Sequence, residues 1–231
     1  MNFTFKRGVI HGLPICLGYL SVSFGFGITA VASNLSPLEA TIISATNLTS
    51  AGQAAGVGII AALGSILEMV LTQLIINLRY SLMAISLSQK LDKSFNTLHR
   101  SIAAFGITDE IFAVAYSNQG KIKPAYMYGM IFISWLGWTT GTLLGSVAGK
   151  ILPAILTGAL GIMLYAMFIA IVVPEAKEHK NVLFAVGVSV LLSIILKYLM
   201  PFVSSGFAII LCAVIASVLS ALIFPLKKEE G

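Results

Sequence analysis

Charged residues are scarce in this sequence. They make up 10% of its 231 positions, against 58% hydrophobic residues, whereas about a quarter of the residues of a soluble domain are charged. Apolar stretches of roughly 18 or more residues recur along the chain, and each is long enough to be a membrane span. The composition therefore predicts an all-α, polytopic integral membrane protein in which residues 1–231 form a single membrane domain, without a soluble module.

Sequence motifs of enzymes are also missing. The chain contains no HExxH zinc-protease motif, no GxSxG nucleophile elbow and no GxxxxGK[ST] phosphate-binding loop, so neither zinc proteolysis, serine hydrolysis nor ATP hydrolysis is predicted. The two cysteines, Cys16 and Cys212, lie in apolar surroundings without metal-ligand or CxxC spacing, which is typical of buried free thiols. We expect no enzymatic activity, no cofactor and no metal site.

The net charge of +5 lies mainly in short loops and tails. Basic residues in such positions stay on the cytoplasmic side of a membrane, so this charge indicates orientation rather than nucleic-acid binding. Lys6 and Arg7 place the N-terminus in the cytoplasm. Lys227 and Lys228 do the same for the C-terminus. The apolar stretch Val9–Ala32 has no evident cleavage signal and is expected to be a retained first span.

Four later segments are long enough to cross a hydrocarbon core of about 30 Å as helices. They are Pro124–Ala148, Pro153–Val173, Asn181–Leu199 and Phe202–Phe224. The segment Leu38–Gln89 is less clear, because its length fits two plain spans or one span plus a re-entrant pair of half-helices.

Loop charges bear on this ambiguity. The loops at residues 90–100 and 121–123 are both basic, so both are expected in the cytoplasm. Ser101–Gly120 is too short to cross twice, and it would then dip into the membrane as a hairpin with Thr108–Glu110 near its tip. A second re-entrant turn is expected around Gly52–Gln53. The alternative is eight plain spans with the 90–100 loop outside. We therefore predict about six to eight transmembrane segments, with re-entrant or broken helices in the N-terminal half.

Polar and small residues gather in the apolar segment 46–58. A broken helix there would free backbone groups that can bind a zwitterionic amino acid, and the amides and hydroxyls would add donors and acceptors. The alternative is a packing face, since Gly52 and Gly56 have GxxxG spacing.

Arg79 lies in a long apolar stretch, where a charge normally faces protein or water and has a partner. Glu68 is eleven residues away, about 16 Å along a helix, so the two cannot pair directly. The partner of Arg79 could be Asp109, Glu110 or the substrate. In the alternative, Glu68 and Arg79 reach opposite membrane surfaces from a helix over Leu67–Gln89.

Asp109 and Glu110 are adjacent acids between apolar residues. A carboxyl group that is removed from water beside a like charge takes up a proton more readily, as a proton carrier must. The alternative is a helix cap, with Thr108 as N-cap and the acids in the first turn. The predicted proton-coupling residues are Asp109, Glu110 and Glu68. The predicted substrate-binding residues are Asn47, Ser50, Gly52, Gln53, Asn77 and Arg79.

Gly137, Gly141, Gly145 and Gly149 form a four-residue ladder that permits close approach by a neighbouring helix or by a second subunit. We interpret it as structural.

A set of short motifs is spread over nearly the whole chain. The most specific are Asn77-Leu78-Arg79 and Thr108-Asp109-Glu110. The others are Phe5 with Gly8, Gly12-Leu13-Pro14, Gly18, Phe24-Gly25, Gly27, Ser50-Ala51-Gly52-Gln53, Phe112, Trp138, Gly141-Thr142 and Ala166-Met167-Phe168 before Pro174. In these motifs the chain resembles the AzlC family, the large subunits of branched-chain amino acid exporters linked to azaleucine resistance.

The resemblance implies a secondary transporter subunit in the bacterial inner membrane that exports branched-chain and related apolar amino acids. It also implies a small hydrophobic partner of the AzlD type, and we expect protons to be exchanged for the substrate; a homo-oligomer remains open. Two positions depart from the family pattern: Tyr80 stands where many members carry His, and Leu160–Leu164 has no acid where many carry Asp. The alternative, from another class, is a channel or a non-transporting scaffold subunit of a membrane complex.

Overall fold

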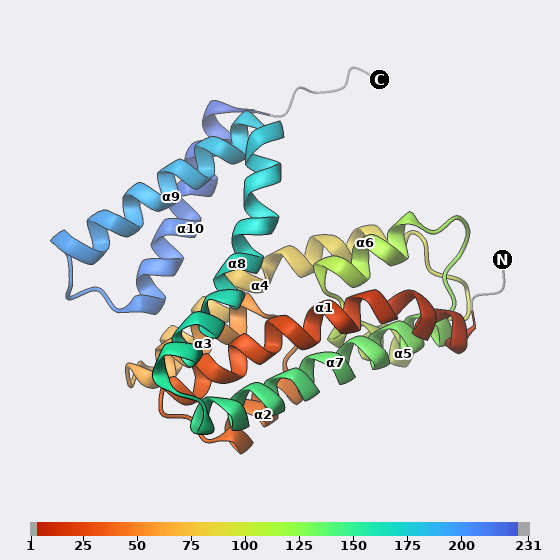
Figure 1. The fold of residues 1–231 in the computed structure, drawn as a ribbon. Helices are drawn as coiled ribbons and strands as arrows, with labels where there is room; N and C mark the ends of the chain where they lie inside the picture. The colour runs from red at the N-terminus through yellow and green to blue at the C-terminus, as the bar shows by residue number, and fades with distance from the viewer. Residues whose placement is uncertain (1–3, 226–231) are drawn as a thin grey trace. The chain divides into compact units, whose positions relative to one another are not determined.

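The computed structural model describes residues 4–225. Apart from one isolated β-bridge, every regular element in this range is a helix (Figure 1), so the all-α prediction is confirmed. The helices are α1 (Phe5–Ala32), α2 (Pro37–Thr46), α3 (Ala51–Ala61), α4 (Ile66–Ser88), α5 (Thr97–Phe105), α6 (Asp109–Ser117), α7 (Pro124–Ile151), α8 (Ala154–Glu178), α9 (Lys180–Leu199) and α10 (Ser205–Ile223). Lys227 and Lys228 lie outside the described residues.

The described residues form two compact units. The first contains residues up to Ala54 together with Ile76–Leu164, and the second contains Ala55–Ile75 together with the described residues from Tyr165 onward. Helices α3, α4 and α8 each contribute residues to both units. That the chain acts as one membrane domain remains a prediction.

Five of the described helices, α1, α4, α7, α9 and α10, are long and apolar enough to cross a membrane. The spans predicted from sequence at the N-terminus and in the second half all coincide with helices. Helix α10 begins at Ser205 rather than at Phe202, because Met200–Ser204 form the turn between α9 and α10.

Helices α1 and α7 form the core of the first unit, and Figure 1 shows them side by side. The backbones touch: a Cβ atom added to Gly137, Gly141 or Gly145 would overlap backbone atoms of α1. The neighbours of these three glycines on α1 are Cys16, Leu20 and Phe24, respectively. The contacting residue on α1 moves up the chain as the glycine on α7 does, so α1 and α7 are parallel. The predicted glycine ladder therefore serves packing, and these three positions are covered by α1 rather than by a second subunit.

Replacing Gly145 by alanine is expected to destabilise this helix pair, because the new methyl group overlaps the carbonyl of Phe24. Overpacking of this kind costs about 1–3 kcal/mol. Gly18→Ala is the matched control, since nothing lies within 4 Å of a Cβ atom at Gly18. The thermal midpoint of the detergent-solubilised protein should fall for Gly145→Ala only, and equal midpoints for the two variants would contradict this packing.

The N-terminal half contains a break within the predicted segment 46–58, a few residues before Gly52–Gln53. Helix α2 ends at Thr46 and α3 begins at Ala51, so Gly52 and Gln53 lie in the first turn of α3 rather than in the turn itself. The turn occupies residues 47–50, where Asn, Thr and Ser side chains compete for backbone hydrogen bonds, and Ser50 has a φ of 42°. Helices α2 and α3 are each about 16 Å long, half of a hydrocarbon core.

Helices α5 and α6 are shorter still, at 9 residues each. The loops before and after them are joined by backbone hydrogen bonds from Asp92 N–H to the Ile122 carbonyl and from Ile122 N–H to the Lys90 carbonyl, both 2.8 Å. The Lys121 ammonium also donates to the Gln89 carbonyl at 2.6 Å. These bonds are consistent with the re-entrant interpretation, in which both loops lie on the same side of the membrane, and that interpretation stays a prediction.

Asp92 is the acid in this basic loop, and Ser94 fixes it. The Ser94 hydroxyl and backbone N–H donate to Asp92 Oδ1 at 2.7 and 3.0 Å. These hydrogen bonds lower the pKa of the Asp92 carboxyl from its ordinary value, so it is ionised at neutral pH. Acids contribute little to membrane orientation, so the loop still counts as basic.

Candidate functional site

The centre of the candidate site is an ion pair between Arg79 of α4 and Asp109, the first residue of α6. Arg79 Nη1 lies 2.7 Å from Asp109 Oδ2, which selects one of the three partners proposed for Arg79. The Arg79 Nη2 group donates to the Tyr80 hydroxyl at 3.2 Å. The pair is open to its surroundings, since the side chains are 38% and 33% exposed. Arg79 Nε is buried and has no hydrogen-bond partner among the described residues.

The depth of this pair follows from helix lengths. Arg79 lies nine residues before Ser88, the last residue of α4, which is about 13 Å along the axis. Helix α5 leads from the same basic loop to the break before Asp109 and is also about 13 Å long. If the loop at residues 90–100 lies at a membrane surface, as the sequence predicts, both lengths put the ion pair close to the middle of a hydrocarbon core of about 30 Å.

The helix-cap explanation of the acids is also correct. Thr108 is the N-cap of α6, and its Oγ1 accepts a hydrogen bond from Ile111 N–H at 3.3 Å. The two acids that follow have different partners, because Asp109 pairs with Arg79 while Glu110 Oε2 lies 2.5 Å from the Tyr19 hydroxyl. Capping therefore accounts for their place in the first turn but not for their contacts.

Tyr19 of α1 is a residue of the site that sequence reasoning missed. Its side chain is buried, and its hydroxyl lies 2.6 Å from Thr108 Oγ1 as well as 2.5 Å from Glu110. A phenol carries one proton, so it can donate to only one of the two at a time. A tyrosine within an apolar span usually needs a partner for its hydroxyl, and that was the available signal.

The polar segment around the α2–α3 break is only partly accessible. Gln53 is buried, its Nε2 donates to Ser44 Oγ at 3.0 Å and its Oε1 accepts from Trp138 Nε1 at 2.9 Å. Ser44 also shares a hydrogen bond of 2.7 Å with Thr142. Gln53 thus ties the start of α3 to α2 and α7, while Asn47 and Ser50 lie in the turn, partly exposed.

Asn77 and Arg79 are two residues apart on α4. Side chains at this spacing do not face each other on a helix, so α4 alone does not bring Asn77 to the ion pair. Its role in binding remains a prediction, as do those of the other residues proposed from sequence.

Glu68 lies in the second unit and binds the start of α10. It is 4% exposed, and its Oε1 accepts hydrogen bonds from Ser204 Oγ at 2.5 Å and from Gly206 N–H at 2.8 Å. A carboxylate at a helix N-terminus is favoured by the free N–H groups and the dipole. Helix α4 does run over the sequence-predicted range, and the Glu68 side chain is buried against protein near its start.

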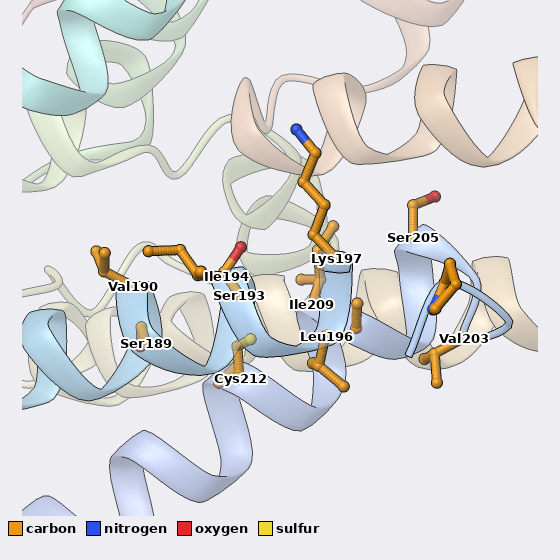
Figure 2. A pocket seen from close by; sticks show the side chains of 13 residues that line it. Ser189, Val190, Ser193, Ile194, Leu196, Lys197, Val203, Ser205, Ile209 and Cys212 are labelled. Carbon is orange, nitrogen blue, oxygen red and sulfur yellow. The ribbon is translucent and has the colours of Figure 1, made fainter. Parts of the chain in front are cut away.

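Two cavities are relevant. A cavity of about 180 Å³ in the first unit is lined mostly by aliphatic side chains, among them Leu87, Ile107 and Met127, with Arg100 also contributing. A larger one, of about 820 Å³, lies between α9 and α10 in the second unit (Figure 2). Its lining contains Lys197 but no acid, so it lacks the paired charges of the Arg79–Asp109 site.

Comparison with known proteins assigns the chain to a family. The family model described as AzlC protein matches residues 14–152, a range that contains every site residue predicted from sequence. The chain belongs to the AzlC family. This is a family of transporters, not of enzymes.

Relatives agree with this assignment. Inner membrane protein YgaZ of Escherichia coli (strain K12) is 31% identical over 186 residues, which cover 77% of this chain and 76% of the relative. An uncharacterized membrane protein of Archaeoglobus fulgidus is 30% identical over 175 residues, covering 75% and 76%. No solved structure matches the chain. The AzlC-family chain is a multi-pass inner membrane protein, like its E. coli relative.

Proposed function

We propose that this AzlC-family protein exports branched-chain and related apolar amino acids across the inner membrane in exchange for protons, together with a small hydrophobic AzlD-type subunit. The observation that carries the proposal is the Arg79–Asp109 pair, which is partly exposed and whose arginine lies about halfway along α4. Charges at such depth are expensive and are found mainly along substrate and ion pathways.

An amino acid zwitterion matches the two charges of this pair. Its carboxylate can take both N–H groups of one edge of the Arg79 guanidinium, and its ammonium can bind Asp109. The substrate would thus insert between two groups that are 2.7 Å apart in its absence. Two new ion pairs then offset the loss of one.

Proton exchange follows from the same geometry. A proton taken up by the adjacent acids Asp109 and Glu110 removes negative charge beside the substrate ammonium and weakens binding. Substrate and proton therefore compete for one site, as exchange in opposite directions requires.

The cavity of about 180 Å³ supports an apolar side chain on the substrate. It reaches Ile107, two residues before Asp109, and its walls are mainly aliphatic. An apolar cavity of about 150 Å³ can hold benzene, so this one can hold a branched aliphatic side chain.

The experiment that tests the function measures efflux of radiolabelled leucine from proteoliposomes, with and without the small partner and a pH gradient. We expect saturable efflux that the gradient accelerates. A leucine flux that rises in proportion to leucine concentration and does not depend on the pH gradient would instead support the channel alternative.

We also propose that six helices cross the membrane, α1, α4, α7, α8, α9 and α10, and that α2–α3 and α5–α6 are re-entrant pairs. The short lengths of α5 and α6, the bonded basic loops and the parallel run of α1 and α7 support this topology. It also puts the starts of α4 and α10 on the outer face, consistent with the Glu68 contacts.

This topology predicts that Lys90, Lys93 and Arg100 face the cytoplasm. A cysteine placed at Ser94 or Asn96, with Cys16 and Cys212 replaced, should not react with an impermeant thiol reagent added outside intact cells. It should react once the cells are opened. Labelling of intact cells would favour eight plain spans.

A further inference from the structure

A buried chain of side chains connects Glu110 with the break between α2 and α3. It begins at the Tyr19 hydroxyl, which lies between Glu110 Oε2 and Thr108 Oγ1. The Tyr19 ring then meets the Trp138 ring edge to face, with centroids 5.2 Å apart and planes at 76°. Trp138 donates to Gln53 at 2.9 Å, and Gln53 donates to Ser44.

The connection is tightly packed. Tyr19 is 6% exposed, Trp138 1% and Gln53 2%. Close-packed interiors leave little room for a ring to move alone, so a shift of the Tyr19 ring has to displace Trp138. A shift of Trp138 in turn strains its bond to Gln53, in the first turn of α3.

We propose that Tyr19 is a positioning residue that transmits the protonation state of Glu110 through Trp138 to Gln53 and the α2–α3 break. When Glu110 is ionised, it is the stronger acceptor, and the phenol donates its hydrogen bond to Glu110. When Glu110 is protonated, the phenol donates to Thr108 instead, and the ring relaxes toward Thr108. The meaning for transport rests on the proposed function, but the contact itself does not.

Other ionisable groups surround Glu110. Arg79 and Tyr80 face the acids from α4, and Asp109 is adjacent on α6. On the remaining helices, His11 of α1 shares a hydrogen bond with Tyr126 of α7, and Lys90 binds carbonyl groups at the opposite end of α6. Variants at Glu110 and Asp109 are therefore needed to identify the titrating acid.

Trp138 can report on this connection, because Trp135 is the other tryptophan of the chain. In the purified full-length Trp135→Phe protein, we expect the emission of Trp138 to change with pH along a single titration curve. The change should disappear with Glu110→Gln, and with Tyr19→Phe, which keeps the ring but removes the hydroxyl. Asp109→Asn should shift the midpoint and keep the amplitude.

The proposal would be overturned if the pH-dependent change in Trp138 emission were unchanged in Tyr19→Phe. It would also be overturned if this change were lost in Asp109→Asn but kept in Glu110→Gln. If Tyr19→Phe does not fold, Thr108→Val provides a second variant. It leaves Glu110 as the only acceptor for the phenol, favours the ionised acid and should lower the midpoint; an unchanged midpoint would contradict the mechanism.

Transport measurements separate this inference from the proposed function. In Tyr19→Phe, we expect gradient-driven leucine efflux to fall about tenfold relative to wild type. If wild-type efflux does not depend on the pH gradient while the emission of Trp138 still changes with pH and needs the Tyr19 hydroxyl, the proposed function fails and the inference about Tyr19 stands. If efflux is proton-driven but insensitive to Tyr19→Phe, the inference fails alone.

Discussion

Arg79→Lys is expected to reduce leucine export by at least about tenfold while the protein inserts at wild-type levels. The guanidinium binds Asp109 through Nη1 and Tyr80 through Nη2, and it lies 5.0 Å from the centroid of the Tyr80 ring. A lysine ammonium is a compact point charge on a flexible stem, and it does not reproduce a planar fork that holds several partners at once. Tenfold corresponds to about 1.4 kcal/mol, less than one charge-assisted hydrogen bond can contribute.

Arg7→Lys is the matched control, because it makes the same chemical change at the start of α1, away from the ion pair. Efflux from both variants should be compared at equal amounts of protein in the membrane. A wild-type rate of leucine efflux in Arg79→Lys would show that a positive charge suffices at this position and that the planar guanidinium group has no role in binding substrate.

The second large effect concerns the two acids, whose variants should differ because their partners differ. Asp109→Asn removes the partner of Arg79 and, in the proposed site, the partner of the substrate ammonium. We expect it to lose both gradient-driven efflux and exchange at equal pH, each by at least about tenfold. Glu110→Gln keeps the Arg79–Asp109 pair, so exchange should survive, while the response to a pH gradient should disappear because this side chain can no longer take up a proton.

Both variants keep Thr108, the N-cap of α6, so a difference between them does not arise from loss of the cap. If Asp109→Asn and Glu110→Gln both retained gradient-driven efflux, the acids would be first-turn capping residues without a role in transport. Glu68 would then be the remaining candidate proton carrier among the residues predicted from sequence.

The architecture was predictable where it depends on local pattern. Apolar length predicted the long helices, since this signal is read within a few tens of residues. The side of the membrane on which the basic loops lie stays a prediction. The glycine ladder predicted a close backbone contact. The helix that packs against the ladder was not predictable, because the complementary glycines and backbone of α1 are more than 100 residues away in the sequence.

The site was predictable as a set of candidates rather than as contacts. Arg79 required a partner, and sequence reduced the choice to three, but the pairing with Asp109 depends on how the α5–α6 segment folds back. The turn was expected at Gly52–Gln53, because glycine permits breaks, yet it lies where Asn47 and Ser50 supply competing polar groups. Tyr19 belongs to no spacing pattern, and its role appears only when α1 is placed beside α6.

Proton movement during leucine transport tests the central claim most directly. Proteoliposomes that contain the protein, the proposed small subunit and a trapped pH indicator are loaded with leucine at equal pH on both sides, then diluted into leucine-free buffer. As leucine leaves, protons should enter, and the lumen should acidify at a rate that saturates with the same leucine dependence as the flux. The signal should be absent in Asp109→Asn. Leucine efflux from the wild-type protein without acidification would contradict exchange at the Arg79–Asp109 pair.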